Sequence, residues 1–366
     1  MLPLRNSLLS IIIPTINEAE NLPFLLADLK LQQNMPLEII VGDGGSTDKT
    51  QSVADCCGAV FVSAKRGRGS QMNAAALHAS GEYLLFLHAD SRIDDPNLLS
   101  NAVEALCTEQ TEPDRTAGHF RLRFIRTTEL NKMAYRYAEE KSAFNRVNTT
   151  NGDQGLMLTR EFFRYLGGFD ESMTFLEDQR IAEKIRLEGK LVTLPGYLKT
   201  SARRFESEGF HRRYILMSMI MGLHSIGAEE FFKRAPEAYQ VQQETGMLFL
   251  SPFFGLIWRM MRDEWGFLGS VRIFYLLGRY VRQNSWQMFY FTDISFRSLL
   301  GDGRYPFLNI HDRVFAPCTD FKVFNTLSGL LCFIWFMGVL APFFMVADNW
   351  RVRFPRHINY RASKSR

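Results

Sequence analysis

Short apolar runs and longer segments of helical periodicity alternate through the first hundred residues. The apolar runs, rich in leucine and β-branched residues, lie at residues 7–13, 37–41, 60–62 and 82–87. The leucines between residues 22 and 29 recur at the spacing of one helix face. Strands that alternate with helices form β-α-β units, so the pattern predicts an α/β domain with a parallel sheet.

Polar turns follow three of these runs. Asp43 and Gly45 lie in the turn after residue 41, a strand end where ligands can approach the backbone closely. Arg66 and Arg68 precede a helix, and guanidinium groups at a helix start favour phosphate. Asp90 follows the fourth run, where a carboxylate can hold Mg²⁺ or Mn²⁺ on a diphosphate. Taken singly, these motifs fit an ordinary turn, a solvated loop and a helix cap equally well.

The next hundred residues continue the α/β pattern. Residues 118–124 predict another strand and residues 128–142 a helix. Glu177 and Asp178 begin a further helix, where carboxylates either cap the helix or supply a general base. A last strand is predicted at residues 190–194, with a loop behind it.

In this order, the motifs resemble the family-2 glycosyltransferases of GT-A fold, and the resemblance covers residues 8–209. The motifs that carry it are Pro14-Thr15-Ile16-Asn17-Glu18, Asp43-Gly44-Gly45-Ser46-Thr47-Asp48, His88-Ala89-Asp90, Gly152-Asp153-Gln154 and Glu177-Asp178. The loop from Arg66 to Asn73 and the pair Arg203-Arg204 are most similar to a bacterial subgroup of small family-2 transferases.

The resemblance implies an inverting transfer of a sugar from a nucleotide diphosphate sugar to an acceptor hydroxyl. Asp178 would be the catalytic base, and Asp90 would hold Mg²⁺ or Mn²⁺ on the diphosphate. The donor-binding residues would be Pro14, Thr15, Asn17, Glu18, Asp43, Gly45, Arg66, Arg68, Gln71, Asn73 and Asp90. The residues that position the acceptor or close over the donor would be Asp153, Gln154, Glu177, Arg203 and Arg204.

Two positions depart from the family pattern. Gly44 stands where the family has a second aspartate in its acidic turn, which leaves open whether the base of the donor is uracil or guanine. His88 replaces the first aspartate of the metal motif, although Asp90 keeps the other ligand position. We therefore still expect a metal at Asp90, but these residues do not define how tightly it binds.

Four parts of the chain are predicted: a catalytic domain at 1–209, a helical and amphipathic extension at 210–325, a hydrophobic segment at 326–347 and a basic tail at 348–366. Residues 327–347 carry no charge and are numerous enough to span a bilayer. The basic tail should stay cytoplasmic, but a single span would then put the catalytic domain on the side without nucleotide sugars. A re-entrant hairpin, an even number of spans or a buried helix in a homodimer would each resolve this conflict.

Net charge and cysteine spacing limit the classes of partner that we expect. A net charge of +4 in 366 residues is too weak to indicate nucleic acid, and the five cysteines show no metal-ligand spacing. We therefore expect an enzyme at the cytoplasmic face of a membrane, the inner membrane in a bacterium, acting on a lipid or lipid-linked glycan of the cell envelope. A nucleotidyltransferase of similar α/β fold and a non-catalytic membrane-associated partner are the alternatives.

Overall fold

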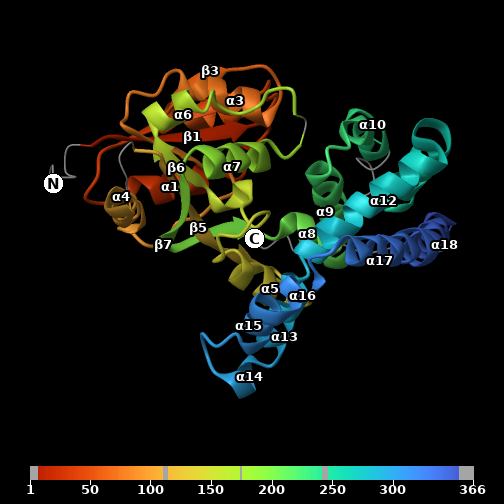
Figure 1. Cartoon of the computed structure of the whole chain (residues 1–366). Helices are drawn as coiled ribbons and strands as arrows, with labels where there is room; N and C mark the ends of the chain where they lie inside the picture. The colour runs from red at the N-terminus through yellow and green to blue at the C-terminus, as the bar shows by residue number, and fades with distance from the viewer. Residues whose placement is uncertain (1–6, 110–113, 174, 241–245, 354–366) are drawn as a thin grey trace. The chain divides into compact units, whose positions relative to one another are not determined.

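The computed structural model describes residues 7–109, 114–173, 175–240 and 246–353. The chain divides into two compact units, residues 1–203 and 204–366, which we call unit 1 and unit 2 (Figure 1). The division falls at the start of α8 (Arg203–Glu208), a few residues before the domain boundary predicted at residue 209. Residues 203 and 204, predicted to lie in a loop, begin this short helix instead.

Unit 1 contains a mixed seven-stranded sheet with the order β3-β2-β1-β4-β6-β5-β7. The strands are β1 (Leu9–Thr15), β2 (Leu37–Asp43), β3 (Val60–Ser63), β4 (Tyr83–Phe86), β5 (Thr116–Ile125), β6 (Leu156–Thr159) and β7 (Lys190–Ser201). The first four strands are parallel, which confirms the β-α-β prediction for this region. The sheet as a whole is not parallel, because β6 runs antiparallel to both of its neighbours, β4 and β5.

Helices cover both faces of this sheet (Figure 1). They are α1 (Leu22–Lys30), α2 (Thr50–Cys56), α3 (Arg68–Ala76), α4 (Leu98–Glu109), α5 (Lys132–Lys141), α6 (Arg160–Tyr165) and α7 (Glu177–Glu188), with the 3₁₀ turn η2 (Gly152–Gln154) before β6. Alternate residues of β1 enter different cores, because successive side chains of a strand point to opposite faces. Ile11 and Ile13 pack with α1 and α4, whereas Ile12 packs with α3, α6 and α7.

Unit 2 is helical, as the sequence predicts for the region after the sheet. Its elements are α9 (Phe210–Ser225), α10 (Glu229–Gln240), α11 (Ser251–Met260), η3 (Met261–Trp265), α12 (Gly266–Gln283), α13 (Trp286–Ser295), α14 (Arg297–Leu300), α15 (Pro306–Ile310), η4 (His311–Phe315), α16 (Ala316–Thr319), α17 (Lys322–Phe333), η5 (Ile334–Leu340) and α18 (Ala341–Arg353). The segments η3, η4 and η5 are π-helical turns within longer helices.

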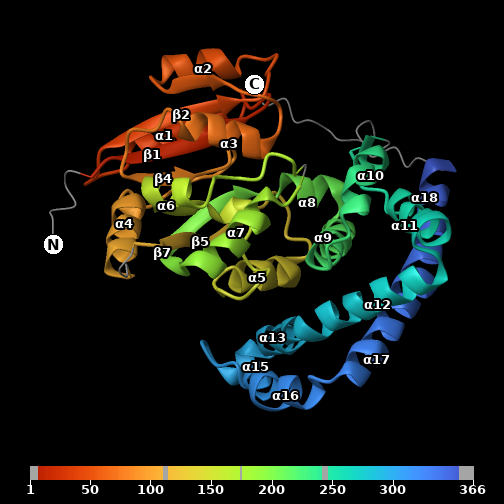
Figure 2. The same cartoon turned by 45° about the horizontal axis from the view of Figure 1, so that its top comes forward.

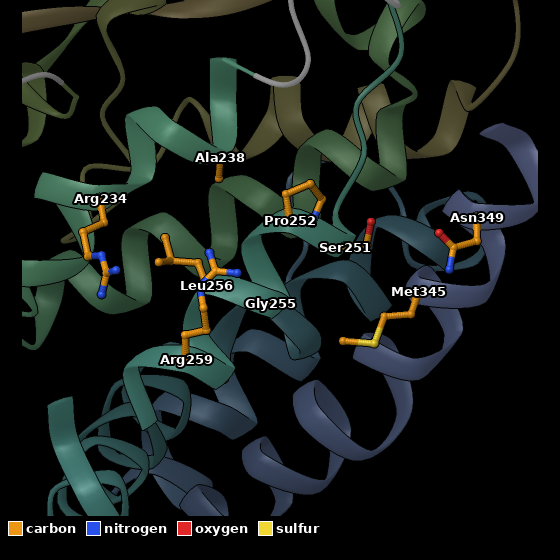
Figure 3. A pocket seen from close by; sticks show the side chains of 9 residues that line it. All are labelled: Arg234, Ala238, Ser251, Pro252, Gly255, Leu256, Arg259, Met345 and Asn349. Atoms are coloured by element: carbon orange, nitrogen blue, oxygen red, sulfur yellow. The ribbon is translucent and has the colours of Figure 1, made fainter. Parts of the chain in front are cut away.

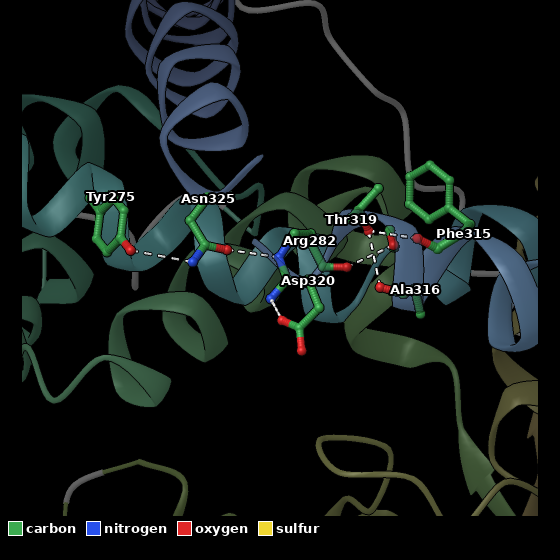
Figure 4. Close-up of polar contacts among 8 residues, drawn as sticks. Tyr275, Arg282, Phe315, Ala316, Thr319, Asp320 and Asn325 are labelled. Atoms are coloured by element: carbon green, nitrogen blue, oxygen red, sulfur yellow. Dashed lines mark hydrogen bonds and ion pairs between the residues drawn. The ribbon is translucent and has the colours of Figure 1, made fainter. Parts of the chain in front are cut away.

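Helices α12 and α17 lie side by side and antiparallel (Figure 1, Figure 2). A Cβ atom on Gly278 would lie 2.2 Å from the backbone nitrogen of Gly329, so only glycine permits this approach. At one end of the contact, Arg282 Nε donates to Asn325 Oδ1 at 2.7 Å, and Arg282 also donates to Asp320 Oδ1 at 2.5 Å (Figure 4). The close contact of Gly278 with Gly329 and the hydrogen bonds of Arg282 together fix the register of α12 against α17.

One helix in the described part of the chain, Lys322–Arg351, is long and apolar enough to cross a membrane, and 22% of its most apolar window is buried. Its last turns are anchored by Asp348, which is 2% exposed. Arg212 donates to Asp348 Oδ1 at 2.5 Å, and the amides of Leu250 and Ser251 donate to Oδ2 at 2.9 Å. The apolar helix is therefore held at this end by α9 and by the start of α11.

Candidate functional site

The acidic turn at the end of β2 is organised by Asp43. Its Oδ2 accepts the amides of Gly45 and Ser46 at 2.9 and 2.8 Å, and its Oδ1 accepts the hydroxyls of Thr15 and Ser46. Burial raises the pKa of Asp43, but these hydrogen bonds outweigh burial and hold the pKa below its ordinary value. The carboxylate is thus ionised and fully bonded within its own turn, next to Pro14 at the end of β1.

The loop after β1 is bonded to the same turn. Asn17, in a left-handed conformation with φ 54°, donates its amide to Ser46 Oγ and accepts the amide of Thr47 on its side chain, both at 2.8 Å. The Glu18 amide donates to Thr50 Oγ1 at 2.9 Å. Two of the predicted donor-binding motifs, separated by about thirty residues, therefore form one surface at the edge of the sheet.

Gln71 explains why glycine stands at residue 44. From α3, its side-chain amide donates to the backbone carbonyls of Thr15 at 2.6 Å and Gly42 at 3.2 Å. A Cβ atom on Gly44 would lie 2.9 Å from Cδ of Gln71. An aspartate at residue 44 would therefore require the side chain of Gln71 to shift and give up its present hydrogen bonds. The predicted donor residue Gln71 is 5% exposed between the strand ends.

Arg68 and Glu177 connect the starts of α3 and α7. Arg68 lies 3.0 Å from Glu177 Oε1, and the side chain of Glu177 is 3% exposed. Burial raises the pKa of Glu177, with a further rise from Asp178, while Arg68 opposes both. Leu176, at φ 64°, turns the chain immediately before these two carboxylates. Such a conformation costs free energy in a residue other than glycine and is a feature of functional sites.

Asp178 and His88 meet over Gly152. Asp178 Oδ2 accepts the Gly152 amide at 2.6 Å, and Oδ1 accepts the Gln179 amide at 2.8 Å. Nε2 of His88 and Oδ2 of Asp178 lie 2.8 and 3.4 Å from the position that a Cβ atom on Gly152 would take. On the other side of its ring, His88 Nδ1 lies 2.7 Å from Asp153 Oδ1. The three predicted motifs at residues 88, 153 and 178 therefore form one polar cluster.

His88, Gly152 and Asp178 of this cluster line a small cavity of about 30 Å³. Its polar side chains are those of Arg68, His88, Asn151, Glu177 and Asp178, and the apolar wall comes from Met72, Phe86, Leu156, Phe169 and Ile181. Desolvation by such a wall strengthens electrostatic interactions among the charged groups.

Asp90 is half-buried after β4, and its carboxylate has no hydrogen bond or ion pair among the residues that the structure describes. No group of three His, Cys, Asp or Glu side chains suited to a metal occurs in the described ranges. One carboxylate can hold Mg²⁺ or Mn²⁺ only if the phosphates of a substrate supply most of the other ligands. Asp90 is compatible with a metal bound in that way.

Two predicted site residues have internal roles. Gln154 is fully buried, and its side chain donates to the Ser142 carbonyl at 2.8 Å and accepts the Asn151 amide at 2.6 Å. Asn73 donates to the Phe169 carbonyl and accepts the Phe169 amide, both at 2.9 Å. Both side chains therefore order the loops around the cavity, and neither lines it.

The remaining predicted arginines are not brought into the cluster. Arg66 is exposed in the loop before α3 and does not line the cavity. Arg203 is exposed at the end of unit 1, where its amide donates to Ser201 Oγ at 3.2 Å, and Arg204 is exposed at the start of unit 2. Their predicted contacts with the diphosphate stay predictions.

The pairs His88–Asp153 and Arg68–Glu177 are features that the sequence did not indicate. Arg68, Glu177 and Asp153 were assigned roles as separate groups on the donor and acceptor sides, whereas His88 was noted only as a departure from the metal motif. The histidine in place of the first aspartate was the available signal, because a histidine ring nitrogen can hydrogen-bond a carboxylate.

Residues 10–165 match the glycosyl transferase family 2 model. The match covers somewhat less than half of the chain and includes β1 to β6, and it supports a sugar-transferring function for this region. The mixed, mostly parallel sheet with helices on both faces and the helical region behind it confirm the predicted fold class, an α/β domain followed by a helical, apolar part.

Curated relatives are similar over part of this region. A PGL/p-HBAD biosynthesis glycosyltransferase of Mycobacterium bovis BCG is 33% identical over 116 residues, which is 30% of this chain and 45% of the relative. An uncharacterized glycosyltransferase of Rickettsia typhi is 28% identical over 179 residues, 47% of this chain and 56% of the relative. The chain spans about half the length of the curated relatives that it matches.

Solved structures show weaker likeness. A mannosyltransferase of Pyrobaculum calidifontis, in complex with GDP-Man and Mn²⁺, is 18% identical with a TM-score of 0.46, covering 95% of this chain and 87% of that one. Residues 1–349 of S. aureus TarS, in complex with UDP, are 17% identical with a TM-score of 0.44. The likeness covers 87% of this chain and 89% of that one.

Proposed function

We propose that this chain is an inverting, metal-dependent family-2 glycosyltransferase that moves a sugar from a nucleotide diphosphate sugar to an acceptor hydroxyl. The observation that carries the proposal is the convergence of Asp178, His88 and Glu177 on one cavity in a domain that matches the family. A metal-dependent nucleotide release that needs Asp178 is the result that this arrangement predicts.

Asp178 acts as the general base. Its carboxylate is fixed by amides of Gly152 and Gln179, so that its orientation is set before the acceptor arrives. Arg68, which pairs with Glu177, also interacts electrostatically with Asp178, so a positive charge lies close to the base. Asp178 takes the proton of the acceptor hydroxyl as the oxygen attacks the anomeric carbon.

On the donor side, Asp90 would hold Mg²⁺ or Mn²⁺, and that cation supplies stabilisation of charge on the leaving nucleotide diphosphate. The bonded turns around Asp43 and Asn17 present a preformed edge to the nucleotide. His88 is kept in orientation by Asp153 and lies next to Gly152, the residue whose amide binds the base. The turns around Asp43 and Asn17 and the side chain of His88 are held by hydrogen bonds without substrate, which lowers the entropic part of the barrier.

The acceptor in this proposal is a lipid or a lipid-linked glycan at the cytoplasmic face of a membrane. Support comes from unit 2, where the helix Lys322–Arg351 exposes large apolar side chains such as Leu331, Trp335 and Val346. Large exposed apolar patches mark interaction with membranes or proteins. A catalytic domain held at the bilayer would meet lipid acceptors in preference to soluble ones.

The test is nucleotide release from a panel of UDP- and GDP-sugars with Mn²⁺ or with a chelator, in the presence of lipid. Removing a general base lowers turnover by about 10²- to 10⁴-fold, which we expect for Asp178→Asn. Asp90→Ala should abolish the metal dependence together with the activity. Asp55→Asn is the matched control, because Asp55 is exposed on α2, away from the cavity.

Other outcomes would redirect the assignment. Release that survives Asp178→Asn would contradict the base role while keeping the donor site. Release of pyrophosphate from a nucleoside triphosphate would indicate a nucleotidyltransferase. An absence of release and of binding with every donor, in folded protein, would indicate a non-catalytic membrane-associated partner.

A further inference from the structure

Unit 2 contains a cavity of about 450 Å³ between α10, α11 and α18 (Figure 3). Arg234 comes from α10, Leu256 and Arg259 come from α11, and Met345 and Asn349 come from α18. This volume lies in the range of sites for small molecules. None of the residues assigned to sugar transfer belongs to it.

The rim of this pocket has an excess of positive charge. Arg234 forms an ion pair with Glu264, and Arg262 forms one with Asp263. Arg259 is exposed and interacts at longer range with Asp263, but no hydrogen bond or ion pair holds it within the part of the chain that the structure describes. Its guanidinium can therefore turn to bind an anion, and a guanidinium fork matches the oxygens of a phosphate group.

The rest of the pocket is apolar and continues onto an apolar surface. Leu256 is 1% exposed inside the pocket, whereas Met345, which also lines it, and its neighbour Val346 are 39% and 68% exposed on α18. Trp258 and Trp350, at 53% and 66%, lie next in sequence to the pocket residues Arg259 and Asn349. Exposed tryptophans are enriched where proteins meet the boundary between membrane and water.

We propose that this pocket binds the phosphate headgroup of an anionic lipid, with Arg259 on the phosphate and the acyl chains along the exposed side of α18. A free phosphate ion would meet the same arginine but would gain nothing from the apolar wall, which is why the geometry favours an amphiphile. The inference rests on the membrane association in the proposed function and is independent of Asp178 and of sugar transfer.

Gly255 provides a variant that fills the pocket without removing charge. A Cβ atom at this position would meet only Arg259 NH1, at 3.9 Å, so a larger side chain has room in the pocket. Leucine also has a higher helix propensity than glycine, and the fold of α11 should tolerate Gly255→Leu. Arg259→Gln removes the free guanidinium, and Arg272→Gln removes an exposed arginine of α12 that does not line the pocket.

The experiment measures binding of the full chain to phosphatidylcholine vesicles with and without phosphatidylglycerol. The preference of the protein for the anionic vesicles should fall about fivefold in Arg259→Gln, the effect of one basic residue near an anionic surface. Gly255→Leu should reduce the preference by a similar factor although its charge is unchanged. Arg272→Gln should retain more of the preference than either pocket variant.

Three results would overturn the proposal. If Gly255→Leu kept the wild-type preference for anionic vesicles, the lipid headgroup would not occupy the pocket. An equal loss in Arg272→Gln and Arg259→Gln would assign the effect to general surface charge. Displacement from the vesicles by inorganic phosphate at low millimolar concentration would indicate a site for the free ion. Because nucleotide release is assayed separately, failure of this proposal and failure of the sugar-transfer proposal are distinguishable.

Discussion

The two units distribute apolar and charged side chains in opposite ways. Among the described residues, 11 large apolar side chains are exposed in unit 1 and 25 in the shorter unit 2. Unit 1 keeps its apolar residues between sheet and helices, and Arg68, Glu177 and Asp178 come together at its cavity. Unit 2 places charged pairs between its helices and large apolar groups outside.

The buried charges of the two units also differ in what they do. In unit 1, Glu177 is buried beside Arg68 at the cavity, where its charge bears on Asp178. In unit 2, Arg212 is buried against Asp348, where the pair joins two helices, and its guanidinium also lies over the Phe344 ring. Polar contacts of this kind hold helices together where the surroundings are themselves apolar and burial of apolar area provides little driving force.

The sharpest test of this difference is removal of the anchor in unit 2. Asp348→Ala leaves the charge of Arg212 buried without its partner and removes the acceptor for two amides at the start of α11. Breaking a buried pair in this way costs about 3–5 kcal/mol, so we expect a large fall in the unfolding temperature. Thermal unfolding in detergent or lipid measures it.

Asp302→Ala is the matched control for that experiment. Asp302 pairs with Arg297 in the same unit, but its side chain is 85% exposed. An exposed pair contributes about 0–1 kcal/mol, so this variant should unfold close to wild type. Equal unfolding temperatures for the two variants would show that Asp348 does not anchor the apolar helix.

Unit 1 should respond to acid through His119, a fully buried residue of β5 that contacts Gln154 of η2. Burial, with a smaller contribution from Arg186 and against a hydrogen bond with the Phe120 carbonyl, lowers the pKa of His119 to about 4. His119 therefore binds a proton below about pH 6.5 in the unfolded chain but not in the folded chain. The free energy of unfolding falls as the pH drops from 6.5 towards 4. The loss approaches about 3 kcal/mol, measured by denaturant unfolding at several pH values.

His119→Gln should flatten this pH dependence, at the cost of some stability at neutral pH. His78→Gln is the control, because His78 is exposed just after α3. An unchanged slope in His119→Gln would assign the acid sensitivity of unit 1 to other groups. Unfolding must be followed by a signal that comes from unit 1 alone, so that the acid response of unit 2 does not contribute to the measured curve.

The smallest expected effect concerns the contact of α12 with α17. Gly278→Ala puts a methyl group against the backbone of Gly329, and overpacking of this kind costs about 1–3 kcal/mol. The unfolding temperature of unit 2 should fall, while nucleotide release should not change. Gly338→Ala is the control, since its Cβ atom would meet only Ile334 Cγ2, at 3.9 Å. A neutral Gly278→Ala would mean that the two helices can separate without loss.

The sequence by itself determined the elements and the order of the motifs. The apolar runs and the leucine spacing before residue 30 predicted the first four strands and α1, because period and turn residues are local properties. The fold class and the family resemblance followed from the same residues. The length of β7, the antiparallel β6 and the helical start at Arg203 were missed, since pairing with distant strands decides them.

Only the tertiary structure decided which side chains meet. His88 and Asp153 are 65 residues apart, and Arg212 and Asp348 are 136 apart. The sequence identified Gln154 and Asn73 as binding residues, and the structure adds hydrogen bonds from both side chains to the backbone of distant loops. A sequence pattern records what each segment prefers locally, whereas contacts between distant segments depend on how the sheet and helices pack. The site and the anchor of the apolar helix are both contacts of that second kind.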